Sequence, residues 1–98
     1  MPDTLEINCV HAFVEGHVQG VGFRYFVKDT AERLQLTGWV RNRYDGAVEV
    51  MAEGPHAKLD ELMQALHTGP SRSTVINVKA EWSHSLGLYT QFSFLATE

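Results

Sequence analysis

The chain has 98 residues, of which 44% are hydrophobic and 20% are charged, and its formal net charge is −4. A length of this order suits one small domain with one hydrophobic core, and no apolar run approaches the roughly 20 residues of a membrane-spanning helix. The acidic balance argues against nucleic-acid binding as the main role, because such domains usually carry an excess of Lys and Arg.

We expect a single domain over residues 1–98 that begins with a short lead-in over about residues 1–6. This lead-in lacks the basic flank and the apolar stretch of a secretory signal. β-branched and aromatic side chains from Ile7 to Glu15 then predict a strand. The strand contains the single cysteine, Cys9, which has no internal disulfide partner, so we expect a reduced core thiol in a cytoplasmic protein.

A glycine-rich loop follows from Gly16 to Gly22, and an amphipathic helix opens directly out of it. The apolar face of this helix, which ends near Gln35, is marked by Phe23, Phe26, Val27, Ala31 and Leu34. A second strand is predicted from Trp39 to Arg43, and the dipeptide Asp45-Gly46 favours a hairpin turn after it.

The alternation of Val48, Val50 and Ala52 with polar residues predicts a half-buried third strand. A second helix follows, with an apolar face of Leu59, Leu62, Met63 and Leu66, and Gly69-Pro70 ends it. A fourth strand is predicted from Ile76 to Trp82, then a turn from His84 to Gly87 and a last strand from about Tyr89 to Leu95.

The resulting order, βαββαβ with one short further strand, predicts an α+β fold. Connection rules favour a split βαβ sheet with two helices on one face. Many unrelated proteins share this order, so the order alone indicates no function.

The loop from Gly16 to Gly22 carries the clearest chemical signal. Consecutive backbone N–H groups in a tight loop can surround an anion, and the N-terminus of the next helix adds a partial positive charge. Arg24 lies in the first turn of that helix, where its guanidinium could donate two parallel hydrogen bonds to the same anion. The alternative is an ordinary strand-to-helix turn without a ligand, since the glycine spacing matches neither a Walker A nor a G-x-G-x-x-G motif.

Two longer strings make the signal specific. G-H-V-Q-G-V-G-F-R, from Gly16 to Arg24, closely resembles the acylphosphatase signature, and L-T-G-W-V-R-N, from Leu36 to Asn42, resembles the second motif of that family. The later strings D-G-A-V-E-V-M-A-E-G, G-P-S-R-S and K-A-E-W also resemble family segments, so the match spans nearly the whole chain.

The resemblance implies a ferredoxin-like α/β sandwich with a five-stranded antiparallel sheet. It also implies hydrolysis of the carboxyl–phosphate bond of a small-molecule acyl phosphate, without metal or cofactor, to a carboxylate and inorganic phosphate. In this family Arg24 would bind the phosphoryl group and Asn42 would position the attacking water. The phosphate cradle would be formed by the backbone amides of His17, Val18, Gln19, Gly20, Val21 and Gly22. Phosphate or sulfate would fit the same loop, and a monomer is the simplest expectation.

Other interpretations of these residues remain open from the sequence. The domain could be a non-catalytic anion-binding module, or an RNA-binding domain that uses aromatic residues on its sheet. Asn42 on its own could be a local hydrogen-bonding residue before the hairpin. Its neighbours Arg41 and Arg43 point to the opposite face of the strand, where we expect solvated charges. For Glu15 we expect a backbone or arginine partner.

Overall fold

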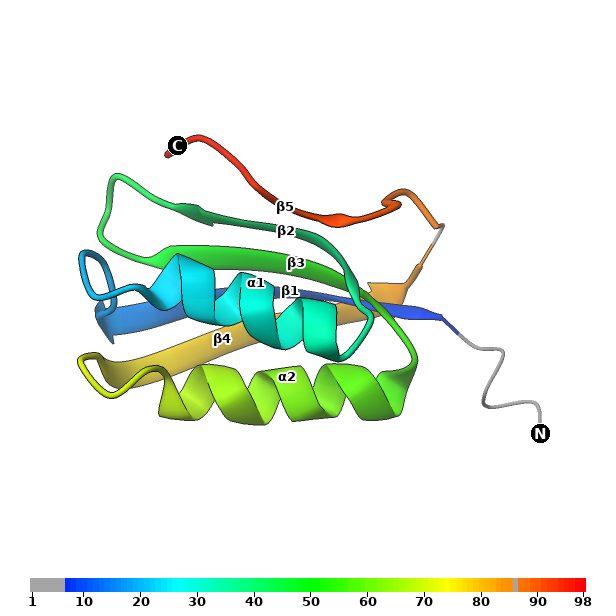
Figure 1. Cartoon of the computed structure of the whole chain (residues 1–98), viewed down its shortest axis with the longest axis horizontal. Coiled ribbons are helices and arrows are strands. Elements are labelled where there is room, and N and C mark those ends of the chain that lie inside the picture. Colours follow the sequence, from blue (N-terminus) through cyan, green and yellow to red (C-terminus); the bar gives the residue numbers. More distant parts are fainter. Residues whose placement is uncertain (1–6, 86) are drawn as a thin grey trace.

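The computed structural model describes residues 7–85 and 87–98. The elements along the chain are β1 (Asn8–His17), α1 (Phe23–Arg33), β2 (Thr37–Asn42), β3 (Val48–Gly54), α2 (His56–Thr68), β4 (Thr74–His84) and β5 (Phe92–Phe94) (Figure 1). The predicted lead-in and Leu86 of the predicted turn lie outside the described residues. Every predicted helix and strand is present, but β1 continues to His17, so the loop before α1 is shorter than predicted.

The strands form one five-stranded sheet in the order β4-β1-β3-β2-β5. β1 is antiparallel to β3 and β4, and β2 is antiparallel to β3. The expectation of a purely antiparallel sheet is wrong at one edge, because β5 is parallel to β2, with Gly38 opposite Phe92 and Val40 opposite Phe94. The chain leaves β4 at one end of the sheet and enters β5 from that same end (Figure 1), so β5 runs opposite to β4. Since β2 also runs opposite to β4, β5 and β2 share one direction.

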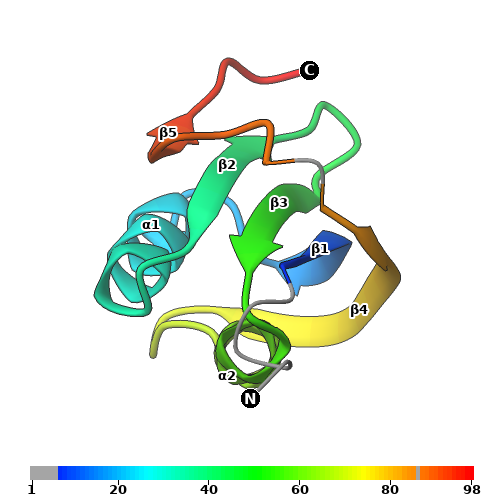
Figure 2. The ribbon, with the colours of Figure 1, turned by 90° about the vertical axis from the view of Figure 1, so that its right-hand side faces the viewer.

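Both helices cover the same face of the twisted sheet (Figure 2), which confirms the predicted ferredoxin-like α+β arrangement. Alternate strand residues face the helices because successive side chains in a strand point to opposite faces. The core is aliphatic apart from Phe23 and Phe92; its fully buried members include Val10, Val14, Val27, Val40, Val50, Leu59, Leu62 and Leu66.

The two tryptophans lie outside the core. Trp82 is 41% exposed on the edge strand β4, where it stacks on His56 at a centroid distance of 4.6 Å. Trp39 is half-buried on the face of the sheet that the helices leave open. An edge strand has a neighbour on one side only, so its side chains bury less surface than those of a central strand.

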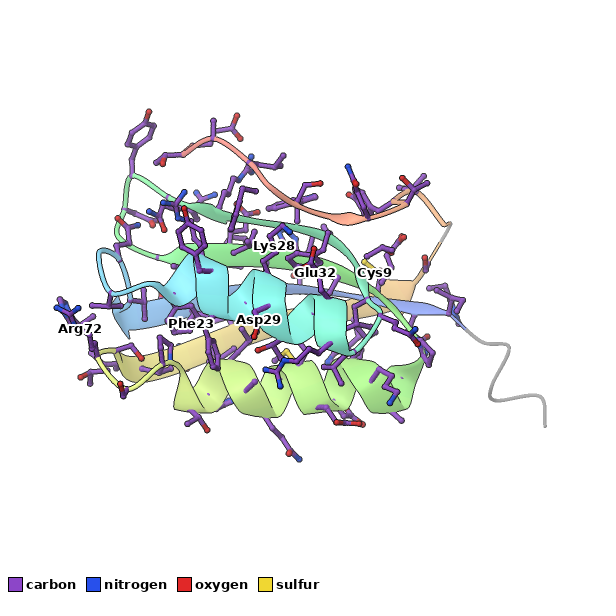
Figure 3. All side chains as sticks on the ribbon, viewed as in Figure 1. Cys9, Phe23, Lys28, Asp29, Glu32 and Arg72 are labelled. Atoms are coloured by element: carbon purple, nitrogen blue, oxygen red, sulfur yellow. The ribbon has the colours of Figure 1, made fainter. Side chains whose placement is uncertain are left out.

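One end of the molecule gathers the connections that matter for function. The β1–α1 loop and the β2–β3 hairpin lie at this end (Figure 1), together with the α2–β4 loop that carries Arg72 (Figure 3). Cys9 lies toward the other end (Figure 3), where its Sγ is 3.2 Å from Met51 Sδ. Cys9 is buried, which confirms the expected core thiol, and its burial raises the pKa of that thiol.

Candidate active site

The glycines at the end of β1 and in the β1–α1 loop divide into two kinds. Gly16 has φ +133°, and a Cβ at this position would collide with the carbonyl oxygen of Thr74 on β4. Gly20 and Gly22 have φ +75° and +80°, and a Cβ on either would meet nothing within 4 Å. Gly16 therefore serves strand packing, whereas Gly20 and Gly22 leave a backbone surface open to a ligand.

The start of α1 adds donors to this open surface. Gly22 is the N-cap residue, in the left-handed conformation, and it supplies no side-chain cap. The first turn contains no acidic residue either. The first N–H groups of a helix have no partner within the helix, and they carry a partial positive charge. This end of α1 is therefore suited to an anion.

Arg24 lies in the first turn of α1 and is half-buried. Its Cζ is 6.0 Å from the ring centroid of Phe94 on β5, and the Tyr25 ring meets the same ring edge-on at 4.9 Å. Within residues 7–85 and 87–98, Arg24 makes no ion pair with a carboxylate. Its charge is therefore placed against an aromatic face and remains available to an anion.

Asn42 is the last residue of β2, opposite Val48 of β3. It lies two residues after the buried Val40, so it faces the helix side of the sheet, as α1 does. Its backbone carbonyl accepts a hydrogen bond from Glu98 N over 3.1 Å. In the described part of the chain its side chain makes no hydrogen bond. The alternative interpretation, that Asn42 only makes a local side-chain hydrogen bond before the hairpin, is therefore not supported within the described residues.

The loop and the strand end that carries Asn42 are joined by a side chain. Gln19 Nε2 donates to the carbonyl oxygens of Arg43, at 2.7 Å, and Ala47, at 2.9 Å. The loop is thus fastened to the β2–β3 hairpin. The sequence indicated a role only for the Gln19 backbone amide, because the position of the hairpin beside the loop depends on tertiary structure.

Behind Asn42, on the open face of the sheet, lies a buried charge cluster around Glu49, which is 3% exposed. Glu49 accepts hydrogen bonds from Arg41 Nε at 2.8 Å and Arg43 Nη1 at 3.1 Å, and His11 Nε2 lies at 2.6 Å. Burial alone raises the pKa of Glu49, but the hydrogen bonds from Arg41, His11 and Arg43 outweigh it and lower the pKa. The expectation that Arg41 and Arg43 are solvated charges is wrong, because both hold a buried carboxylate.

Two further acidic groups have structural partners. Asp45 Oδ1 accepts from Ala47 N over 3.0 Å, and this hydrogen bond lowers the pKa of Asp45, with a smaller contribution from Arg43. Glu15 accepts from Asn77 Nδ2 at 3.2 Å and lies 3.4 Å from Lys79 Nζ, so the expected backbone or arginine partner was wrong.

Residues that could bind a metal ion are not grouped together. Over residues 7–85 and 87–98, no three His, Cys, Asp or Glu side chains are placed to share one. None of the described helices has the length and apolar character needed to cross a membrane.

The fold and this site together define a ferredoxin-like α+β protein with a glycine-rich loop that is hydrogen-bonded, through Gln19, to the hairpin after Asn42. The family model described as Acylphosphatase matches residues 10–94. The acylphosphatase of Bacillus velezensis is 48% identical over 83 residues, which cover 85% of this chain and 92% of that protein. The acylphosphatase of Moorella thermoacetica is 49% identical over 77 residues, covering 79% and 83% of the two chains.

Solved structures agree with this match. The crystal structure of acylphosphatase from Bacillus subtilis has a TM-score of 0.87 at 42% identity, covering 90% of this chain and 98% of that one. Full-length HypF, solved in a phosphate- and nucleotide-bound form, has a TM-score of 0.86 at 25% identity over 95% of this chain and 12% of that chain. The chain belongs to the acylphosphatase family, whose members are hydrolases that act on acyl phosphates.

Proposed function

We propose that the β1–α1 loop and Arg24 hold the phosphoryl group of an acyl phosphate while Asn42 positions the attacking water. The cradle consists of the backbone amides of residues 17–22, and the Arg24 guanidinium completes it. The observation that supports this assignment most is the state of Arg24. It carries no ion pair within the described residues, and it lies in the first turn of a helix whose first amides have no side-chain cap.

The reaction needs little acid–base assistance. The leaving carboxylate is a weak base, so it departs without a strong general acid. The remaining task is to hold the phosphoryl oxygens and align a water with the bond that breaks. The Asn42 carbonyl can accept a hydrogen bond from that water, but an amide is a poor base. The proton of the water therefore passes to an oxygen of the substrate's own phosphate.

The test is hydrolysis of benzoyl phosphate by the wild type, Arg24→Ala and Asn42→Ala, with and without EDTA. Arg24→Ala should lower turnover at least about 10²-fold, as removal of an oxyanion-binding donor does. Arg33→Ala is the matched control, since Arg33 ends the same helix and, among the described residues, forms an ion pair only with the exposed Asp29. Near-normal turnover by Asn42→Ala would contradict its role, and loss of activity in EDTA would contradict a metal-independent reaction.

The same assay separates an enzyme from a binding module. A protein that hydrolyses no acyl phosphate, yet unfolds at higher temperature when phosphate is added, would be an anion-binding module. We further propose that phosphate or sulfate occupies the loop, and that the chain works as one domain and as a cytoplasmic monomer. The unpaired, buried Cys9 supports a reducing location. Sedimentation of the purified protein tests the monomer.

A further inference from the structure

Gln19 occupies a particular place relative to Asn42. Its two acceptors are the carbonyls of Arg43, the residue after Asn42, and Ala47, the residue before Val48. Asn42 and Val48 are themselves a register pair across β2 and β3. The Gln19 carboxamide therefore binds both sides of the hairpin connection, one residue beyond the pair that contains Asn42.

The orientation of this carboxamide is determined by its partners. A carbonyl oxygen can only accept a hydrogen bond, so the group that faces Arg43 O and Ala47 O must be the NH₂ group of the carboxamide. Both Gln19 N–H groups therefore point to the hairpin. Each carbonyl also has a backbone donor: Gly46 N donates to Arg43 O over 3.1 Å, and Arg43 N donates to Ala47 O over 2.9 Å. A carbonyl oxygen has two lone pairs, so Gln19 completes the hydrogen bonding of the hairpin.

The other anchors of the loop around Gln19 are apolar. Val18 is buried in the core and Val21 packs against it, whereas Gly20 and Gly22 have open space where a Cβ would lie. Glycines are conformationally permissive, so these positions do not hold the loop in place. Among the described residues, the Gln19 side chain is the polar link between the cradle and the hairpin that follows Asn42.

We propose that Gln19 is a positioning residue for the hydrolysis: its carboxamide sets the distance between the phosphate cradle and the water held by Asn42. This inference rests on the roles proposed above for the loop and Asn42. A displaced water lies out of line with the bond that breaks, and a shift of about 1 Å can cost 10²-fold in rate. Phosphate binding depends on the loop amides and Arg24, so it should change little.

The experiment replaces Gln19 with methionine, which keeps the length and removes the two hydrogen bonds. Turnover of benzoyl phosphate, its KM and inhibition by phosphate are measured well below the unfolding temperature. We expect kcat to fall about 10- to 10²-fold, with the phosphate inhibition constant within about 3-fold of wild type. Gln64→Met on the exposed side of α2 is the matched control and should leave both unchanged.

A double mutant tests whether Gln19 acts through Asn42. In the Asn42→Ala background there is no positioned water to misplace, so Gln19→Met should lower kcat less than about 3-fold. Equal losses in both backgrounds would overturn the inference, and so would a lower melting temperature with unchanged kcat. If Gln19→Met does not fold, Gln19→Asn keeps the amide but is too short to reach both carbonyls, and the same measurements apply. Failure of the Asn42 role is seen separately, as normal turnover of Asn42→Ala alone.

Discussion

Arg41 and Glu49 face each other directly across β2 and β3, and Arg41 Nε lies 2.8 Å from Glu49 Oε1. The same Glu49 oxygen accepts from Arg43 over 3.1 Å, so the two residues that flank Asn42 in sequence share one buried carboxylate. Arg41 also reaches Glu98 at 2.8 Å and lies 4.7 Å from the centroid of the Trp39 ring. The strand end that presents Asn42 on one face is therefore held by ion pairs on the other.

Glu49→Gln should destabilise the fold. The neutral amide leaves Arg41 with a weaker acceptor and His11 facing a group without charge, in a place sheltered from water. Loss of a hydrogen bond to a charged, buried group costs about 1–3 kcal/mol. Urea unfolding measures this, and Glu81→Gln on the exposed strand β4 is the control, expected within about 0.5 kcal/mol of wild type. Equal stability of the two variants would contradict a stabilising role for the cluster.

The same carboxylate predicts a pH dependence of stability. The pKa of Glu49 in the folded protein lies below the ordinary value of 4.5. The folded state therefore binds this proton less readily than the unfolded state, and the contribution to stability is complete only above pH 4.5. It is lost as the pH falls below that value through the folded-state pKa. The difference in unfolding free energy between the wild type and Glu49→Gln should shrink over this range, and a constant difference would speak against it.

Alanine at Gly16, near the end of β1, and at Gly20, in the loop, should have different consequences. Gly16→Ala places a Cβ against the Thr74 carbonyl of a paired strand, which adds overpacking of about 1–3 kcal/mol to the backbone strain. Gly20→Ala has free space, so it costs only the left-handed backbone penalty of about 1–2 kcal/mol. Thermal unfolding should show the larger loss for Gly16→Ala, whereas phosphate inhibition should weaken more in Gly20→Ala, whose methyl group enters the open surface. The reverse order would argue against a cradle at Gly20.

Phe94→Leu should weaken phosphate binding without unfolding the protein. Leucine keeps an apolar side chain at the β5 edge but removes the ring beside the Arg24 guanidinium. A cation–π contact at a partly exposed site contributes about 0.5–1 kcal/mol, which corresponds to about a two- to fivefold change. The phosphate inhibition constant is the readout, with Tyr44→Leu on the exposed hairpin as control. An unchanged constant would mean that Phe94 does not help to hold Arg24 in its binding orientation.

Much of this protein is determined by local pattern in the sequence. Helical spacing located both helices, and residue type together with period-2 alternation located the strands, because side-chain direction within an element depends on its own geometry. Asp45-Gly46 marked the hairpin, and only glycine readily adopts the φ of +98° seen at Gly46. The strings from Gly16 to Arg24 and from Leu36 to Asn42 indicated the family, and the comparisons confirmed it.

Tertiary structure decided what depends on distant partners. β5 is parallel to β2 because the chain passes from β4 to β5 at one end of the sheet. No local sequence pattern indicates that path. From the sequence, Arg41 and Arg43 are expected to be solvated charges. In the fold, β3 places Glu49 within ion-pair distance of both. The Gln19 side chain likewise gains its role only when the hairpin, more than twenty residues further along the chain, supplies two carbonyls to its amide. Hydrogen bonds and ion pairs need partners within about 3–4 Å, and residues far apart in sequence reach that distance only through the fold.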